Sequence, residues 1–240
     1  MLYGGSIINE LLDLVFPPRC LLCRSRLSPW GKGAGICRDC ISRVETVGFF
    51  CPRCGFLSRE SSRCYCSKMQ KLFLFGVFWY QGFWRKSVHR FKYYHRPYLA
   101  TSLGRSMAYF LSGFPAFPLS QIEMVTFVPL HGEKEKERGY NQSFLLAREL
   151  AEAWSLPLQS TLKRCRPTSP QTSLGRGERR RNLHGAFMSE NENNFRDKHV
   201  LIIDDVITTG ATMEEASRRL IADGARKTTG AALAVQRLFY

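Results

Sequence analysis

The pattern of apolar positions predicts an α/β fold whose most informative element begins near residue 200. The run Val200-Leu201-Ile202-Ile203 is typical of a strand buried on both faces of a parallel sheet. A Thr/Gly turn at 208–212 follows, and the chain then takes up helical spacing. The apolar positions on one face of that helix are Met213, Ala216, Leu220 and Ile221.

Similar patterns predict the rest of the sheet and its helices. Strands are expected at residues 72–80, 123–130 and 230–237, and helices at residues 97–111 and from Asn141 onward. Residues 7–16 should form an amphipathic helix that ends at Pro17-Pro18. Strands that alternate with helices in this way indicate an α/β domain with a parallel sheet.

Length and composition allow one α/β domain with a small appendage. The chain has 240 residues, 44% of them hydrophobic, with 35 Lys and Arg against 20 Asp and Glu, a net charge of +15. This excess favours polyanionic partners, namely phosphorylated substrates, nucleic acid or an anionic membrane surface. No apolar run is long enough to span a bilayer, and no basic region precedes residues 7–16. We therefore expect no integral membrane segment and a cytoplasmic location.

Eight of the nine cysteines form four short chelating pairs in the first third of the chain. Three pairs have C-x-x-C spacing and the last is C-x-C. Each pair can supply two thiolates to a tetrahedral Zn²⁺ site, so eight cysteines suit two closed, structural Cys₄ sites. We expect sequential pairing, in which the first two pairs bind one ion and the last two bind the other, because it closes shorter loops than interleaved pairing. The alternative to a metal site is a cluster of ordinary reduced thiols. The expected ligands are Cys20, Cys23, Cys37, Cys40, Cys51, Cys54, Cys64 and Cys66.

The turn after residue 203 has the chemistry of a sugar-phosphate site. Asp204 and Asp205 follow the strand and can accept hydrogen bonds from a vicinal diol. The helix that opens on Thr208 to Thr212 directs backbone N–H groups and its positive dipole end toward a phosphate. The alternative is a plain helix cap beside acids that discourage edge pairing.

This segment resembles the PRPP-binding signature of type I phosphoribosyltransferases. A hydrophobic strand, Asp204-Asp205 and then Thr208-Thr209-Gly210-Ala211-Thr212 agree with it in order and spacing. The resemblance implies that the two acids hold the ribose hydroxyls and that residues 208–212 hold the 5′-phosphate. Lys92 and Arg138 are among the cations that we place near the pyrophosphate. The expected PRPP-binding set is therefore Lys92, Arg138, Asp204, Asp205, Val206, Thr208, Thr209, Gly210, Ala211 and Thr212.

Two more segments are similar to the ComF-type phosphoribosyltransferases, which are linked to competence and DNA uptake. A strand ending in Pro129-Leu130-His131 leads to Arg138-Gly139-Tyr140-Asn141-Gln142, where the family usually has Phe in place of Tyr140. Residues 168–187, with Arg176 and Arg179, resemble the segment that forms a flexible hood over the active site. For these arginines, a nucleic-acid patch or a solvated loop is the alternative.

The resemblance covers nearly the whole chain and implies its architecture. We expect a Rossmann-like parallel sheet with a flexible hood, preceded by a small Cys₄ double zinc ribbon, with domains at residues 1–68 and 69–240. It also implies Mg²⁺ bound with PRPP. The residues expected to act in catalysis are Asp204, Asp205, Arg176, Arg179 and His131.

The acceptor of the phosphoribosyl group has no recognisable signature, so three functions stay open. The first is an active transferase. The second is an accessory protein that binds single-stranded DNA, with PRPP as a regulatory ligand or with none. The basic, aromatic stretch at 82–96 favours it, although an amphipathic helix with solvated charges explains that stretch equally well. The third is a scaffold that docks a helicase-like competence protein through its zinc module.

Overall fold

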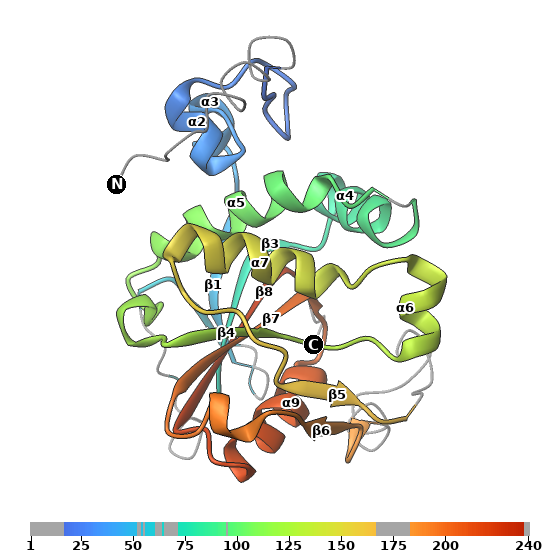
Figure 1. Cartoon of the computed structure of the whole chain (residues 1–240). Coiled ribbons are helices and arrows are strands. Elements are labelled where there is room, and N and C mark those ends of the chain that lie inside the picture. Colours follow the sequence, from blue (N-terminus) through green and yellow to red (C-terminus); the bar gives the residue numbers. More distant parts are fainter. Residues whose placement is uncertain are drawn as a thin grey trace.

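A twisted, mostly parallel sheet forms the centre of the molecule (Figure 1). The computed structural model describes residues 17–51, 54, 56–60, 64, 72–94, 96–166 and 183–237. Within these residues, six strands pair in the order β2-β1-β3-β8-β7-β4. Their bounds are β1 Thr46–Phe50, β2 Leu57–Ser58, β3 Leu72–Trp79, β4 Met124–Phe127, β7 His199–Ile207 and β8 Lys227–Val235. Strands β3, β8, β7 and β4 run parallel, as the sequence predicts, whereas β1 and β2 are antiparallel additions at one edge.

Helices cover both faces of the sheet (Figure 1). α5 (Leu99–Ser112) and α7 (Gln142–Trp154) pack on one face, with α4 (Gly82–Tyr93) beside them, and α9 (Ala211–Ala222) packs on the other. The apolar positions of α9 at Met213, Ala216 and Leu220 are buried, as their helical spacing predicts. Ile221 is partly buried against the same core.

The structure adds one helix that the sequence analysis did not expect, and it corrects the predicted end of one strand. The charged segment after His131 forms a helix, α6 (Gly132–Arg138), which ends at Gly139 with a positive φ of 76°. The strand at 200–203 continues through both acids to Ile207, because β8 pairs with it as far as Ile207↔Val235. The two acids are therefore strand residues.

A small antiparallel pair lies apart from the main sheet. β5 (Leu162–Arg164) pairs with β6 (Phe187–Ser189), and short 3₁₀ turns occur at Leu119–Gln121 and Glu192–Asn194. Residues 167–182, which contain most of the expected hood, lie outside the described residues. So does the helix expected at 7–16.

The N-terminal segment is joined to the main sheet and to its core. It contains two short helices, α2 (Pro29–Ala34) and α3 (Arg38–Ile41), and it supplies both antiparallel edge strands. Ile36 and Phe49 belong to the same apolar cluster as Leu103 of α5 and Leu146 of α7. The division into domains at 1–68 and 69–240 stays a prediction, and it assigns strands of one sheet to two domains.

Among the residues that the structure describes, no helix is both long enough and apolar enough to span a membrane.

Candidate functional site

The acids of β7 lie where two neighbouring strands end at different heights. β4 pairs with β7 only as far as Phe127↔Ile203, whereas β8 continues beside β7 to Ile207. The chain leaves β4 for α6, so Asp204 and Asp205 face a hollow at the carboxyl edge of the sheet. Open α/β sheets bind their ligands at this edge.

Asp204 is held by two donors and opposed by a like charge. Its Oδ1 accepts hydrogen bonds from Ser143 Oγ and from the Asp205 backbone N–H, each at 2.8 Å. Burial and the neighbouring Asp205 carboxylate raise the pKa of Asp204 to about 6, although these hydrogen bonds and Lys92 act in the opposite direction. The carboxyl group therefore changes charge near pH 6 instead of near pH 4.

Lys92 reaches the acid pair from α4. Its Nζ lies 2.9 Å from Asp205 Oδ2. Burial lowers the pKa of Lys92, but attraction to Asp205 and Asp204 outweighs it, so the net shift is upward. The ammonium group is charged and neutralises part of the acid pair.

The Thr/Gly turn forms a cradle at the start of α9. Gly210 precedes the helix with a φ of 80°, a backbone conformation that favours glycine. Thr208, Gly210, Ala211 and Thr212 line the cavity, whereas Thr209 is buried and its Oγ1 accepts from the Ala211 N–H at 3.4 Å. Thr209 thus accepts from the first N–H of the helix on the buried side, while its neighbours face the open space.

Three further cations approach the same cavity from α6 and β5. Burial and the charges of Arg164 and Arg138 lower the pKa of Lys134, and burial lowers the pKa of Arg164. Arg138 donates from Nη1 to Gln142 Oε1 at 3.1 Å, and its guanidinium lies 5.2 Å from the centre of the Tyr93 ring. Positive charges crowded at one wall favour a polyanionic ligand.

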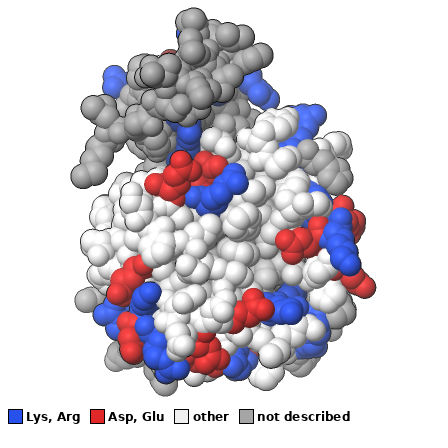
Figure 2. All heavy atoms as spheres, in the orientation of Figure 1, with Lys and Arg blue, Asp and Glu red and all other residues white. Residues whose placement is uncertain are grey.

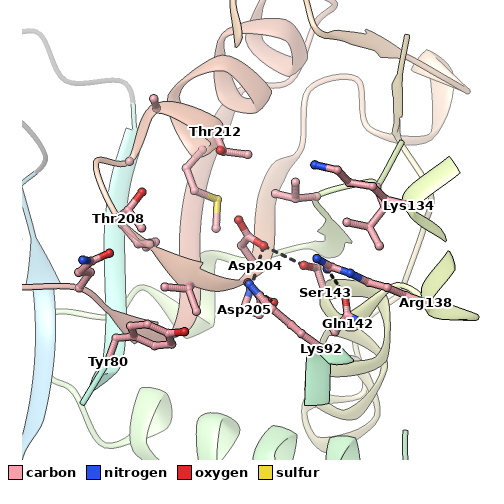
Figure 3. A pocket seen from close by; sticks show the side chains of 18 of the residues that line it. Tyr80, Lys92, Lys134, Arg138, Gln142, Ser143, Asp204, Asp205, Thr208 and Thr212 are labelled. Carbon is pink, nitrogen blue, oxygen red and sulfur yellow. Dashed lines mark hydrogen bonds and ion pairs between the residues drawn. The ribbon is translucent and has the colours of Figure 1, made fainter. Parts of the chain in front are cut away.

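These groups surround one cavity of about 460 Å³, a size typical of small-ligand sites (Figure 3). Lys134 and Arg138 come from one side of the acid pair, Thr208 and Thr212 from the other, and Lys92 reaches it from below in this view (Figure 3). The lining also includes Tyr80, His89, Tyr93, Val128, Leu130, Gln142, Val206, Ile207, Met213 and Gln236.

The structure thus brings together most of the residues singled out in the sequence. Lys92, Arg138, Asp204, Asp205, Val206 and four residues of the turn line one cavity. His131 does not line it. It precedes α6, and its Nδ1 lies 3.7 Å from Glu133 Oε2, so its catalytic role stays a prediction. Arg176 and Arg179 lie outside the described residues.

Several cavity residues were not identified from the sequence. Lys134 lies one helical turn before Arg138, a spacing that becomes visible only once residues 132–138 are known to be helical. Ser143 follows the Asn141 cap of α7 directly. Arg164 lies on a three-residue strand with no distinctive local pattern, so only the tertiary fold identifies it.

The cysteines gather into two clusters in the N-terminal segment. The sulfur atoms of Cys20, Cys23, Cys37 and Cys40 all lie within 4.8 Å of one another, and those of Cys51, Cys54 and Cys64 form a second such group. The first two cysteine pairs thus form one cluster and the third pair lies in the other, as sequential pairing predicts. Cys66 lies outside the described residues. Four thiolates at these separations suit a tetrahedral structural zinc ion.

Two known protein families match this chain, one in its N-terminal segment and one in its C-terminal part. Residues 11–69 match the double zinc ribbon domain, and residues 140–237 match the phosphoribosyl transferase domain. The first match contains all eight paired cysteines, and the second contains the acid pair and the cradle.

Relatives extend over nearly the whole chain. The DNA utilization protein YhgH of Salmonella typhimurium is 33% identical over 223 residues, which are 88% of this chain and 94% of the relative. Competence protein F of Haemophilus influenzae is 30% identical over 84% of this chain and 90% of its own length. Competence protein ComFC of Bacillus subtilis is 27% identical over 92% and 93%. This chain therefore belongs to the ComF family, in which a double zinc ribbon precedes a phosphoribosyltransferase domain.

Proposed function

We propose that this protein binds PRPP with Mg²⁺ and transfers the phosphoribosyl group to an acceptor. One observation carries the proposal. A phosphate cradle, an acid pair and a cluster of cations line a single cavity of about 460 Å³. PRPP carries a 5′-phosphate, a ribose diol and a pyrophosphate, which are complementary to these three groups.

The cradle and the acid pair suit the ribose 5-phosphate half of PRPP. The backbone around Gly210 and Ala211 lies at a helix N-terminus, which favours a phosphate dianion. The carboxylates of Asp204 and Asp205 are acceptors for the ribose hydroxyls. Their place on a strand paired with β8 keeps them fixed relative to the cradle.

The opposite wall suits the pyrophosphate. Arg138 and Arg164 repel Lys134 there, and a pyrophosphate would relieve that repulsion while accepting hydrogen bonds from these cations. The carboxylate oxygens of the acid pair fit Mg²⁺, which usually binds one or two carboxylates together with substrate phosphates. When bound, Mg²⁺ would add positive charge next to the leaving group.

In such a transfer, the bond between the anomeric carbon and pyrophosphate breaks as the acceptor approaches. Positive charge develops on the ribose ring, and negative charge develops on the leaving oxygen. Asp204 and Asp205 hold the ring beside their negative charge, while the cations of α6 and β5 stabilise the leaving group. Fixed orientation of the sugar between cradle and acids keeps the anomeric carbon accessible to the acceptor.

The names of the relatives indicate the process that this activity serves. YhgH is called a DNA utilization protein, and two other relatives are called competence proteins. We infer that the present chain acts in the uptake or use of DNA.

Calorimetric titration with PRPP tests this function directly. We expect Mg²⁺-dependent binding of PRPP that is tighter than the binding of ribose 5-phosphate or pyrophosphate alone, because PRPP occupies both walls at once. Equal affinity for PRPP and one fragment would mean that only one wall is used. Absence of binding by all three would refute the proposal.

Binding of single-stranded DNA is a second candidate, favoured by the exposed side chains of α4 and the segment after it. Arg85, Lys86 and Arg90 are exposed, and Tyr94 and Tyr98 are 59% and 65% exposed. Cations interleaved with aromatic rings suit phosphates and stacked bases. The aromatic residues Trp84 and Phe91 are buried instead, so part of this stretch serves the core. Figure 2 shows small mixed clusters of acids and bases on the visible face, without one continuous basic patch there.

The salt dependence of DNA affinity tests whether the exposed cations of α4 bind DNA or are only the solvated face of a helix. Replacing Lys86 and Arg90 by Ala should make the slope of log affinity against log salt shallower by about 1.4, or 0.7 for each lost phosphate contact. The control replaces Arg148 and Lys198, which removes the same charge elsewhere. Equal slopes in both variants would leave α4 without a role in DNA binding.

A further inference from the structure

The hydroxyl group of Tyr140 connects the loop between α6 and α7 to the end of α4. The hydroxyl donates to the Phe91 carbonyl at 2.5 Å and accepts from the Arg96 N–H at 3.1 Å. Phe91 lies in the last turn of α4, where helix carbonyls lack partners within the helix. A side chain from the loop between α6 and α7 therefore satisfies the end of α4.

Tyr140 is itself fixed from both sides. Gly139 ends α6 before it, and Asn141 caps α7 after it by accepting from the Ser143 and Phe144 N–H groups. The Asn141 Nδ2 also donates to the Val128 carbonyl at the end of β4. The phenol ring packs near Phe91, with ring centres 5.8 Å apart. The hydroxyl is thus anchored to the central sheet.

The turn that Tyr140 holds carries two residues of the cavity wall. Lys92 pairs with Asp205 at 2.9 Å, and the Tyr93 ring lies under the Arg138 guanidinium. Each of these contacts crosses from α4 to another element. A displacement of this turn would therefore disturb the contact between Lys92 and Asp205.

We propose that Tyr140 is a positioning residue, whose hydroxyl fixes the last turn of α4 and thereby holds Lys92 against Asp205. An effect of Tyr140 on PRPP binding rests on the proposed function. The geometry of the Lys92–Asp205 ion pair, however, can be tested without PRPP.

The first test measures how fast Lys92 is acylated by an amine-directed reagent, followed by peptide mass spectrometry. An ammonium group held in an ion pair reacts slowly, so Tyr140→Phe should speed acylation of Lys92 roughly 3-fold to 10-fold, the equivalent of one net hydrogen bond. Lys86, exposed on the same helix, is the internal reference and should not change. Tyr98→Phe is the matched control, and Asp205→Asn gives the rate for a fully released Lys92.

Phenylalanine keeps the ring that packs near Phe91, so Tyr140→Phe removes only the hydroxyl group. Faster acylation of both Lys86 and Lys92 would show that the whole helix α4 has loosened. That result, or an unchanged rate at Lys92, would overturn the proposal. A selective increase at Lys92 supports it. The measurement uses the full chain without PRPP, so it decides the positioning role even if the proposed function is wrong.

A double-mutant cycle on PRPP affinity tests whether Tyr140 acts through Lys92. Tyr140→Phe should weaken PRPP binding roughly 3-fold to 10-fold in the wild-type background, but less than about 2-fold in a Lys92→Met background. Equal losses in both backgrounds would show that the hydroxyl acts independently of Lys92 and would contradict the proposal. Failure of the wild-type protein to bind PRPP would refute the proposed function instead.

Discussion

At the scale of single residues, Asp204 combines its proposed role in binding with a cost in stability. Its pKa is raised from 3.8 to about 6, mainly because burial and Asp205 oppose its negative charge. Between about pH 4 and pH 6 the folded protein therefore binds more protons than the unfolded chain. Linkage then requires that the contribution of this carboxyl to stability is full below pH 4, falls as the pH rises, and is lost above pH 6.

This leads to a prediction about Asp204→Asn. The neutral amide keeps an Oδ1 acceptor for Ser143 and the Asp205 N–H, but it removes the opposed charge. The thermal midpoint of the variant should exceed that of wild type above pH 6, and the difference should shrink toward pH 4. Glu152→Gln, at an exposed position of α7, is the control. A midpoint below wild type at pH 7.5 would contradict the expected sign.

At the scale of elements, the sequence predicted each parallel strand, but it predicted the bounds of β3 better than those of β4, β7 and β8. The aliphatic run before Asp204 is unmistakable, yet β7 extends through the acids because β8 offers small partners such as Ala232 and Ala234. Pairing with a neighbouring strand is a tertiary effect that a local pattern does not contain. The acids themselves were found because their spacing from the Thr/Gly turn is a local property.

The charged segment before Gly139 is a helix that the local pattern of apolar residues does not reveal. Its residues have good helix propensity, but they have no apolar face to signal a helix. Recognising the helix would have placed Lys134 beside Arg138. Arg164 could not have been found in this way, since its position depends on how β5 packs near α6.

Replacing Asn141 tests how the helix α7 is held to the sheet. Asn141 is buried, caps α7 and ties that helix to the end of β4. Asn141→Ala should lower the free energy of unfolding by about 1–3 kcal/mol, because both the cap and a buried hydrogen bond are lost. Chemical denaturation measures the change. The exposed Asn194→Ala should stay within about 0.5 kcal/mol of wild type, and a similar loss in both variants would show that the cap has no special importance.

At the scale of the whole molecule, the zinc ribbon and the phosphoribosyltransferase domain share a sheet and a core. The sequence indicated a separate appendage, since the cysteines give a strong local signal while β1 is a short apolar stretch among them. β1 pairs with β3, and Cys51 follows it directly. Ser106 of α5 also donates to the Ala34 carbonyl of α2 at 2.9 Å. The structure of the ribbon is thus coupled to the sheet.

Zinc removal tests this coupling. The purified protein should contain close to two Zn²⁺ per chain, since eight paired thiolates complete two tetrahedral sites. Chelation should lower the midpoint of one cooperative unfolding transition, because loss of the ribbon frees β1 from the sheet. Two separate transitions by calorimetry, with the second unaffected by chelator, would mean that the ribbon unfolds alone.

The central claim is that the acid pair on β7 binds the ribose of PRPP, and calorimetric titration of one double variant tests it most directly. Asp204→Asn combined with Asp205→Asn keeps the shape of the site and removes its negative charge. PRPP affinity at pH 7.5 with Mg²⁺ should fall by about 1.5–3 kcal/mol for each lost charged hydrogen bond. Glu152→Gln with Glu192→Gln removes the same charge at exposed positions and should bind like wild type. Unchanged PRPP affinity in the folded Asp204/Asp205 variant would contradict the account.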